Sequence, residues 1–168
     1  VHPNEYAPGS AHFFSSALND WHKFDTKLVN LDMRLGKGEN PETSDNYLRF
    51  KTSDGNDIGL DITFAYRIDP KKAPFILEYV AQSDEELREK VVETVCRSRP
   101  RDLFGELDTE SFYTATKRNA ASERAKIALN EVLNPLGVIV EKVDSGNYHF
   151  LNDEYAQAIK DKKLFDGE

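Results

Sequence analysis

The stretch Leu48–Pro70 constrains the fold more than any other part of the sequence. From Ile58 to Tyr66 every second side chain is apolar and the residues between them are small or polar. This is the period-2 alternation of a strand with one buried face. The pair Asp54-Gly55 separates this run from a shorter alternating run, and Asp-Gly is typical of tight hairpin connections. We therefore expect a β-hairpin that ends near Pro70, because proline has no N–H to donate.

A second strand is expected in the segment Thr26–Leu35. Its odd-numbered positions from Val29 onward are apolar and the residues between them are polar, so this strand also has one buried face and can pair with the hairpin. The segment Gly36–Asn46 holds two glycines, a proline and no large apolar side chain. We expect it to be a solvent loop.

After Pro70 the pattern changes from strands to helices. Pro74 can open a short apolar helix, and Ser83-Asp84-Glu85-Glu86 has the form of a capping box, in which Glu86 reaches back to the serine N–H. The helix that follows should end at Pro100. Its apolar stripe consists of Leu87, Val91, Val92 and Val95.

The next helix should begin near Asp108 or Thr109 and end at the segment Asn134–Gly137, which contains both a proline and a glycine. The apolar, largely β-branched segment Val138–Val143 predicts a strand that returns to the sheet. Asn152-Asp153-Glu154 then predicts a C-terminal helix. The chain should therefore be an α+β protein, with a strand-rich part at 1–70, a helix-rich part with a returning strand at 71–151, and the start of a helix at 152–168.

Composition excludes several classes of protein. A net charge of −8 over 168 residues should repel nucleic acid and anionic head groups. The single cysteine rules out an intramolecular disulfide. No run approaches the roughly 18 apolar residues of a membrane span. Because the chain begins without methionine and ends just after a charged run, we expect it to be a piece of a longer protein.

Large apolar residues crowd the beginning of the chain without a clean helical or strand period. Two interpretations remain open: a loop packed onto the sheet, or an exposed apolar loop that contacts a membrane or a partner. The residues concerned are Phe13, Phe14, Leu18, Trp21 and Phe24.

The sequence assembles no recognisable catalytic, metal or cofactor site. The chain has four histidines, none of which is spaced for metal binding on one helix. Asp57 and Asp61 lie about 13 Å apart at strand rise, too far for cooperation, and a solvated outer face accounts for them. Cys96 is expected to be a buried structural thiol. Phosphate-binding glycine loops and nucleophile elbows are absent from the sequence.

One local basic cluster stands out. Arg97, Arg99 and Arg101 surround Pro100. Two interpretations remain open here as well: these cations stabilise the C-terminus of a helix, or they contact the acidic face of a neighbouring subunit.

The order of these segments resembles the SPFH family, also called band 7, which includes stomatin, prohibitin, flotillin and the HflK/HflC pair. The resemblance is carried by the motifs Thr52–Gly55, Tyr66–Pro70, Leu133–Val143 and Glu154–Lys162, together with Pro8-Gly9 and the aromatic pair that follows. It covers nearly the whole chain.

The resemblance implies an α+β domain on a membrane surface, behind a membrane segment and ahead of a coiled coil that both lie outside this sequence. It further implies no enzymatic activity, assembly with other SPFH subunits into rings or cages, contact with lipids, and in some members association with an AAA+ membrane protease. By the resemblance, residues 1–70 would face the membrane, and Phe13, Phe14, Leu18 and Trp21 would be candidates for lipid contact.

A different class of function also remains open, namely a soluble ligand-binding or catalytic α+β domain. A deep pocket lined by convergent polar groups would favour that reading. If the chain is a scaffold subunit, we expect these 168 residues alone to be monomeric or weakly associating, because a coiled coil would supply much of the assembly energy.

Overall fold

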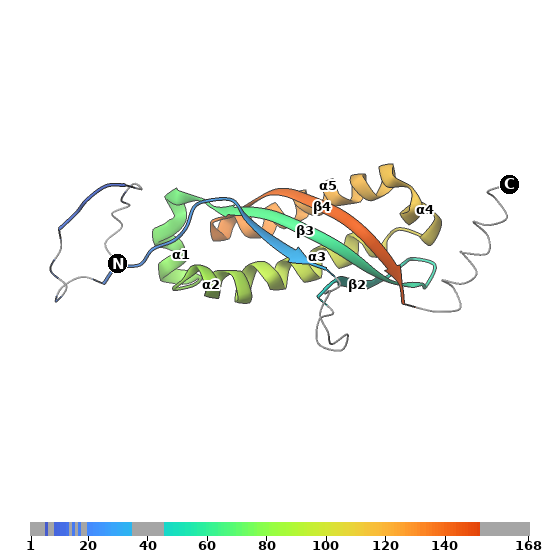
Figure 1. Cartoon of the computed structure of the whole chain (residues 1–168), viewed down its shortest axis with the longest axis horizontal. Helices are drawn as coiled ribbons and strands as arrows, with labels where there is room; N and C mark the ends of the chain where they lie inside the picture. The colour runs from blue at the N-terminus through green and yellow to red at the C-terminus, as the bar shows by residue number, and fades with distance from the viewer. Residues whose placement is uncertain are drawn as a thin grey trace.

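The fold is an antiparallel sheet with helices packed on one face. A computed structural model describes residues 6, 9–13, 15, 17, 20–34 and 46–151. Strand β3 (Asp57–Ile68) is central: β1 (Val29–Met33) and β2 (Leu48–Lys51) pair with successive parts of one edge, and β4 (Val138–Phe150) pairs with the other edge. In Figure 1 the sheet lies in front of the long helices. The predicted α+β class is confirmed.

The hairpin forms as the sequence predicts. Strands β2 and β3 are antiparallel, with Leu48 opposite Leu60 and Lys51 opposite Asp57. Between them the amide of Gly55 donates to the carbonyl of Thr52, and Gly55 adopts φ +90°, a conformation that glycine adopts without steric cost. The even-numbered side chains of β3 from 58 to 68 are buried. The alternation in the sequence therefore reports which face meets the core.

Strand β4 is longer than the sequence predicts and is irregular. It runs on past Val143 to Phe150, and its pairing with β3 shifts register at two places, between Leu60 and Ile62 and between Ala65 and Tyr66 of β3. Such β-bulges bend a strand and redirect its side chains. The second half of this strand was not predicted because the segment 144–147 is polar and the prediction relied on apolar residues.

The helices lie between β3 and β4 in the sequence and cover the apolar face of the sheet. Helix α5 packs against β4 and α3, and α3 packs against β2. The helical elements are η1 (Pro70–Lys72), α1 (Ala73–Tyr79), α2 (Asp84–Leu87), the π-helical turn η2 (Arg88–Val92), α3 (Glu93–Gly105), α4 (Thr109–Tyr113), α5 (Ala115–Leu133) and η3 (Asn134–Leu136).

The expectation that Pro100 ends its helix is wrong. Pro100 lies inside α3, which continues to Gly105. A proline there removes one helical hydrogen bond and costs about 3 kcal/mol. The added turn buries Phe104 completely, with its ring centroid 5.9 Å from Phe50 and 6.2 Å from Phe112. Burial of a large aromatic side chain offsets much of that cost.

The expectation of one continuous helix from Asp108 to Leu133 is also wrong. Asp108 does cap a helix, because its carboxylate accepts from the amide of Ser111 at 2.6 Å. This helix, α4, ends at Tyr113. The next residue, Thr114, is extended, with φ −78° and ψ 113°, and α5 starts at Ala115. The break turns Phe112 into the aromatic core.

The capping box forms with one change of partner. The amide of Glu86 donates to the Ser83 hydroxyl at 3.2 Å, as predicted, but the Glu86 carboxylate accepts from the amide of Gln82 at 2.8 Å instead of from Ser83. The carboxylate therefore fastens the connection between α1 and α2.

Helix α1 is seated firmly at one end of the molecule. Ile76 is fully buried and lies against Gly137, and the Lys72 ammonium donates to the carbonyl of Asn134 at 2.7 Å. Both contacts join α1 to the connection between α5 and β4. Figure 1 shows α1 at the end of the domain opposite α4 and β2.

Three sequence-based expectations fall outside the described residues: nearly all of the loop 36–46, the helix from residue 152, and the side chains of Phe14 and Leu18. The division of the chain at residue 70 stays a proposal. Residues on both sides of it share the sheet, because β4 pairs with β3.

Candidate interaction surfaces

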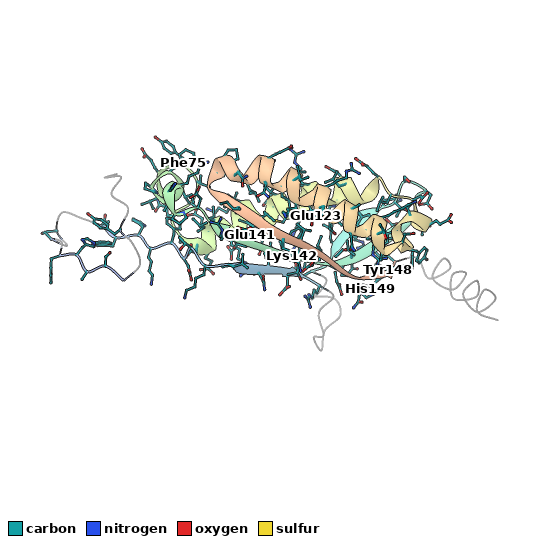
Figure 2. The ribbon with its side chains drawn as sticks, turned by 90° about the horizontal axis from the view of Figure 1, so that it is seen from above. Phe75, Glu123, Glu141, Lys142, Tyr148 and His149 are labelled. Atoms are coloured by element: carbon teal, nitrogen blue, oxygen red, sulfur yellow. The ribbon has the colours of Figure 1, made fainter. Side chains whose placement is uncertain are left out.

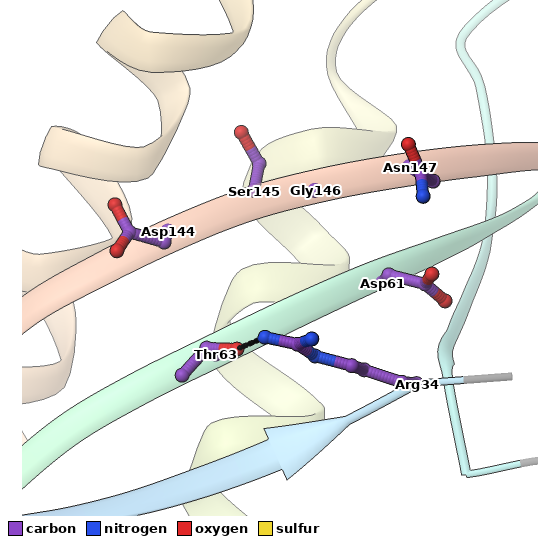
Figure 3. Close-up of a pocket in the computed structure, with 7 residues that line it drawn as sticks. All are labelled: Arg34, Asp61, Thr63, Asp144, Ser145, Gly146 and Asn147. Carbon is purple, nitrogen blue, oxygen red and sulfur yellow. Dashed lines mark hydrogen bonds between the residues drawn. The ribbon is translucent and has the colours of Figure 1, made fainter. Parts of the chain in front are cut away.

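The face of the sheet opposite the helices is polar and carries a small hollow. The hollow encloses about 170 Å³ and is lined by Arg34, Asp61, Thr63 and the segment 144–147 of β4. Figure 3 shows Arg34 just after the end of β1 and the other residues on β3 and β4, with Gly146 and Asn147 opposite Asp61. At Gly146 an added Cβ would lie 3.2 Å from the Asp61 carbonyl oxygen. The hollow thus owes its shape to the bulge in β4.

Hydrogen bonds fix the side chains at the β1 side of this hollow. Arg34 donates to the Thr63 hydroxyl at 2.9 Å, and that hydroxyl donates to the Asp32 carboxylate at 2.6 Å. Arg34 also lies 3.4 Å from Asp32. These groups satisfy one another across β1 and β3. Exposed ion pairs of this kind contribute little to stability.

Asp61 differs from the solvated carboxylate that the sequence suggested. Its side chain is only 15% exposed, and Oδ1 lies 3.6 Å from Nε2 of His149 on β4. Asp57 is exposed and lies 3.9 Å from the Lys51 ammonium. The sequence could not place Asp61 in this environment, because His149 is 88 positions away in the chain and is brought opposite Gly59 only by the pairing of β3 with β4.

The hollow lacks the arrangement that activates a nucleophile. Among the described residues, the Ser145 hydroxyl makes no hydrogen bond with an imidazole or a carboxylate, and such a base is what converts serine into a nucleophile. Among all the residues that the structure describes, no three histidine, cysteine or acidic side chains come close enough to hold a metal ion.

A second, larger hollow lies where the segment before β1 meets α2. It encloses about 380 Å³. Tyr66, Ile68 and Leu87 form its floor and are all buried. Its rim carries charges of both signs, from Asp25, Lys27, Arg67, Asp84, Glu85 and Arg88.

The predicted structural role of Cys96 is confirmed. Its side chain is fully buried in α3. Burial, with a smaller contribution from Glu93, raises the pKa of the thiol to about 12. A thiol with that pKa is not a nucleophile at neutral pH.

The arginine cluster is divided between two sides of α3. Because α3 continues to Gly105, the arginines do not stabilise a helix C-terminus, and that interpretation is wrong. Arg97 donates to the Asn46 side chain just before β2. Arg101 lies one turn further on the same side, whereas Arg99, two positions from each, points to another. Their role at a subunit interface stays a prediction.

The N-terminal aromatic residues that the structure describes differ in exposure. Phe13 is 101% exposed and Trp21 is 57% exposed, whereas Phe24 packs against the core. The packed-loop interpretation therefore holds for Phe24 and is wrong for Phe13 and Trp21. Their contact with lipid stays a prediction.

An aromatic pair on α1 escaped the sequence analysis. Phe75 and Tyr79 lie one helical turn apart, with ring centroids 5.2 Å apart, and are 41% and 68% exposed. The sequence did contain a signal for this exposed pair. Most residues of this short helix are apolar, and one buried stripe cannot accommodate that many apolar side chains. Figure 2 shows Phe75 at the end of the molecule, pointing away from the sheet.

The chain matches the model of a known protein family. The family model described as "SPFH domain / Band 7 family" matches residues 6–166. No curated protein matches the chain. Within the described residues, none of the helices has the length and apolar character needed to cross a membrane.

Proposed function

The chain belongs to the SPFH domain / Band 7 family, and we propose that it is a non-enzymatic scaffold domain of a membrane-anchored protein. Proteins of this family are in general associated with membranes and oligomerise. In this chain the domain would assemble with other SPFH subunits into a ring or cage and would organise or regulate membrane proteins, with a membrane protease as one candidate partner. Family membership is the observation that carries the proposal.

One feature of the chain supports it. Exposed aromatic side chains occur both in the N-terminal segment and on α1. Exposed apolar groups of this kind favour an interaction surface.

The same proposal gives Arg97 and Arg101 a role in assembly. They share one side of α3, where a neighbouring subunit with an acidic surface would meet two cations. The net charge of −8 makes acidic surface abundant on each copy. Complementary charges of this kind set the register of an interface more than its affinity.

The test uses the full-length protein in its own membrane. Crosslinking before detergent extraction, followed by affinity purification, should recover multimers of the protein together with specific membrane proteins. The Arg97→Glu, Arg101→Glu variant should shift the crosslinked species toward smaller sizes, whereas Arg49→Glu, an exposed arginine of β2, should not. Recovery of monomer alone, with no enriched membrane protein, would refute the scaffold proposal.

The larger hollow supports a second candidate function, the binding of a small ligand. Its volume of about 380 Å³ lies in the range of ligand pockets, and its apolar floor and charged rim are typical of them. Thermal denaturation of the purified chain against a library of amphipathic metabolites tests this directly. A concentration-dependent rise in Tm that is lost in Arg88→Ala would support ligand binding.

A further inference from the structure

The larger hollow has an unpaired hydroxyl group on its apolar floor. Tyr66 is only 5% exposed and lines the hollow together with Ile68 and Leu87. Its hydroxyl forms no hydrogen bond with any residue that the structure describes. This is unusual, because the hydroxyl of a buried tyrosine normally finds a partner. An unpaired donor on the floor of a hollow indicates where a ligand could supply the missing acceptor.

Charges of both signs surround this hydroxyl. Burial raises the pKa of the Tyr66 hydroxyl, and of the neighbouring charges Arg88 lowers it whereas Asp84 raises it. Cys96 and Glu93 add to the rise. Arg88 and Asp84 also line the hollow. The hydroxyl therefore has a cation and a carboxylate near it on the same side of the molecule.

Hydrogen bonds hold the walls of the hollow in place. The amide of Asp25 donates to the Asp84 carboxylate at 3.0 Å, and the amide of Lys27 donates to the Asp25 carboxylate at 3.0 Å. Ser83 caps α2 by accepting from the amide of Glu86. Figure 1 shows the chain that leads into β1 passing the end of the domain where α1 and α2 lie. The segment before β1 is thereby fixed against α2.

The charges on the rim balance, and some of them are available to a ligand. The acidic and basic side chains of the rim are three of each: Asp25, Asp84 and Glu85, and Lys27, Arg67 and Arg88. Arg67 is paired with Glu141 at 2.7 Å, and Arg88 lies 3.5 Å from Glu93 with 44% of its side chain exposed. Within the described residues Lys27 and Glu85 form no ion pair.

A balanced rim over an apolar floor favours a ligand that carries both charges. An ion of one sign would be attracted by half of the rim and repelled by the other half. It would also cover rim charges without pairing with them, which is costly. A ligand with one carboxylate, one ammonium group and a hydrocarbon body meets all three parts of the hollow.

We propose that the larger hollow binds a free α-amino acid with a large apolar side chain. The hydrocarbon side chain packs on the floor, and the carboxylate accepts hydrogen bonds from Tyr66 and Arg88. The ammonium group pairs with the carboxylates of Asp84 and Glu85 at the start of α2. The inference rests on the second candidate function, the binding of a small ligand, and names the chemical class of that ligand.

The first test is isothermal titration calorimetry of the purified chain with L-phenylalanine and three analogues. Hydrocinnamate lacks the ammonium group, phenethylamine lacks the carboxylate, and L-alanine lacks the large apolar side chain. L-Phenylalanine should bind at least about tenfold more tightly than either one-charge analogue, as expected for hydrogen bonds to a charged group. It should also bind at least about tenfold more tightly than L-alanine, because the ring is buried on the floor.

The second test assigns each charge of the ligand to its partner. Tyr66→Phe removes only the unpaired hydroxyl, so it should weaken L-phenylalanine and hydrocinnamate about tenfold and leave phenethylamine unchanged. The Asp84→Asn, Glu85→Gln variant should instead weaken L-phenylalanine and phenethylamine about tenfold, with hydrocinnamate bound no more weakly. Its asparagine keeps an oxygen that can accept from the amide of Asp25. A merely structural role for these side chains would change all three affinities alike.

Matched controls alter the same chemical groups outside the hollow. Tyr79→Phe removes the hydroxyl of a tyrosine that is 68% exposed on α1. Glu89→Gln removes the charge of an exposed carboxylate one position beyond Arg88. Neither residue lines the hollow, and both variants should bind every compound like the wild type.

Equal affinity for L-phenylalanine and either one-charge analogue, or wild-type affinity for L-phenylalanine in Tyr66→Phe, would overturn the inference. So would the absence of binding by both L-phenylalanine and L-leucine. If another amphipathic compound then raises the Tm and loses this effect in Arg88→Ala, the second candidate function stands with a ligand of a different class. If no compound does so, that candidate function fails as well. The crosslinking experiment tests the scaffold proposal separately from either result.

Discussion

Gly137 offers a test of how α1 is attached to the rest of the domain. It connects η3 to β4 with φ +90°, and a Cβ added there would lie 2.7 Å from Cδ1 and 2.8 Å from Cγ1 of Ile76. Gly137→Ala should therefore destabilise the protein in two ways. The left-handed backbone costs about 1–2 kcal/mol for alanine, and forcing a methyl group against Ile76 costs about 1–3 kcal/mol more.

Gly55 is a matched control for this substitution. It has the same φ of +90°, but an added Cβ would have nothing within 4 Å. Gly55→Ala should therefore show only the backbone cost of about 1–2 kcal/mol. The difference between the two alanine variants measures the steric contribution of the side chains around Gly137, which are Ile76 and, with its Cβ at 3.0 Å, Lys72.

Urea unfolding of the purified chain, followed by circular dichroism, measures both losses. A double-mutant cycle adds the decisive comparison: in an Ile76→Ala background, Gly137→Ala should cost no more than Gly55→Ala does, giving a coupling of about 1–3 kcal/mol. Equal losses for the two glycine variants in the wild-type background, or a cycle with no coupling, would refute the proposed packing of α1 against Gly137.

Three further predictions follow from particular contacts. Burial raises the pKa of Cys96 to about 12, so iodoacetamide should label this thiol only in urea, and rapid labelling of the native chain would contradict its burial. Asn130 donates to the carbonyl of Val140 at 2.9 Å and accepts from its amide at 2.8 Å. Asn130→Ala should therefore lower the unfolding free energy by about 1–3 kcal/mol, with the exposed Asn119→Ala nearly neutral in the same urea assay. Burial works to raise the pKa of Asp54, but hydrogen bonds from neighbouring threonines outweigh it and lower the pKa below its usual value. The ionised carboxylate therefore stabilises the fold above about pH 4, and the stability advantage over Asp54→Asn should shrink as the pH falls through the lowered pKa; an advantage independent of pH would refute this.

The contacts of Asp54 show that the hairpin turn also holds the first residue of α4 in place. Its carboxylate accepts from the amide of Thr109 at 3.1 Å and from the Thr109 hydroxyl at 2.8 Å. Asn56 also donates to that hydroxyl, at 2.8 Å. The turn between β2 and β3 thereby fastens the start of α4. The sequence identified the turn but gave no sign of this second role.

The strand-rich part of the fold could be predicted because its signals are local. Alternation in β1 and β3 fixes which side chains face the core, and Asp54-Gly55 fixes the connection. The predictions fail where a distant residue changes the outcome. Pro100 stays within α3 because the next turn buries Phe104. The break at Thr114 separates α4 from α5 although helical periodicity continues beyond it.

The candidate surfaces were harder to predict than the elements that carry them. The sequence distinguished Trp21 as a large apolar residue in a polar context, and the structure places it in solvent. The sequence analysis predicted a short apolar helix there and did not single out Phe75 and Tyr79. Amphipathic periodicity assigns one buried stripe to a helix, but α1 is too short for its period to show which apolar side chains lie outside that stripe.

By itself the sequence determined the α+β order of elements, the two-faced central strand, the hairpin and the family resemblance that the match over residues 6–166 establishes. Only the tertiary structure decided what covers each face. Gly59 reads as a small residue of a polar face, yet the ring of Tyr47 lies so close that an added Cβ would be 2.5 Å from it. The physical reason is that periodicity records whether a side chain is apolar, whereas its burial depends on which distant segment the fold brings against it.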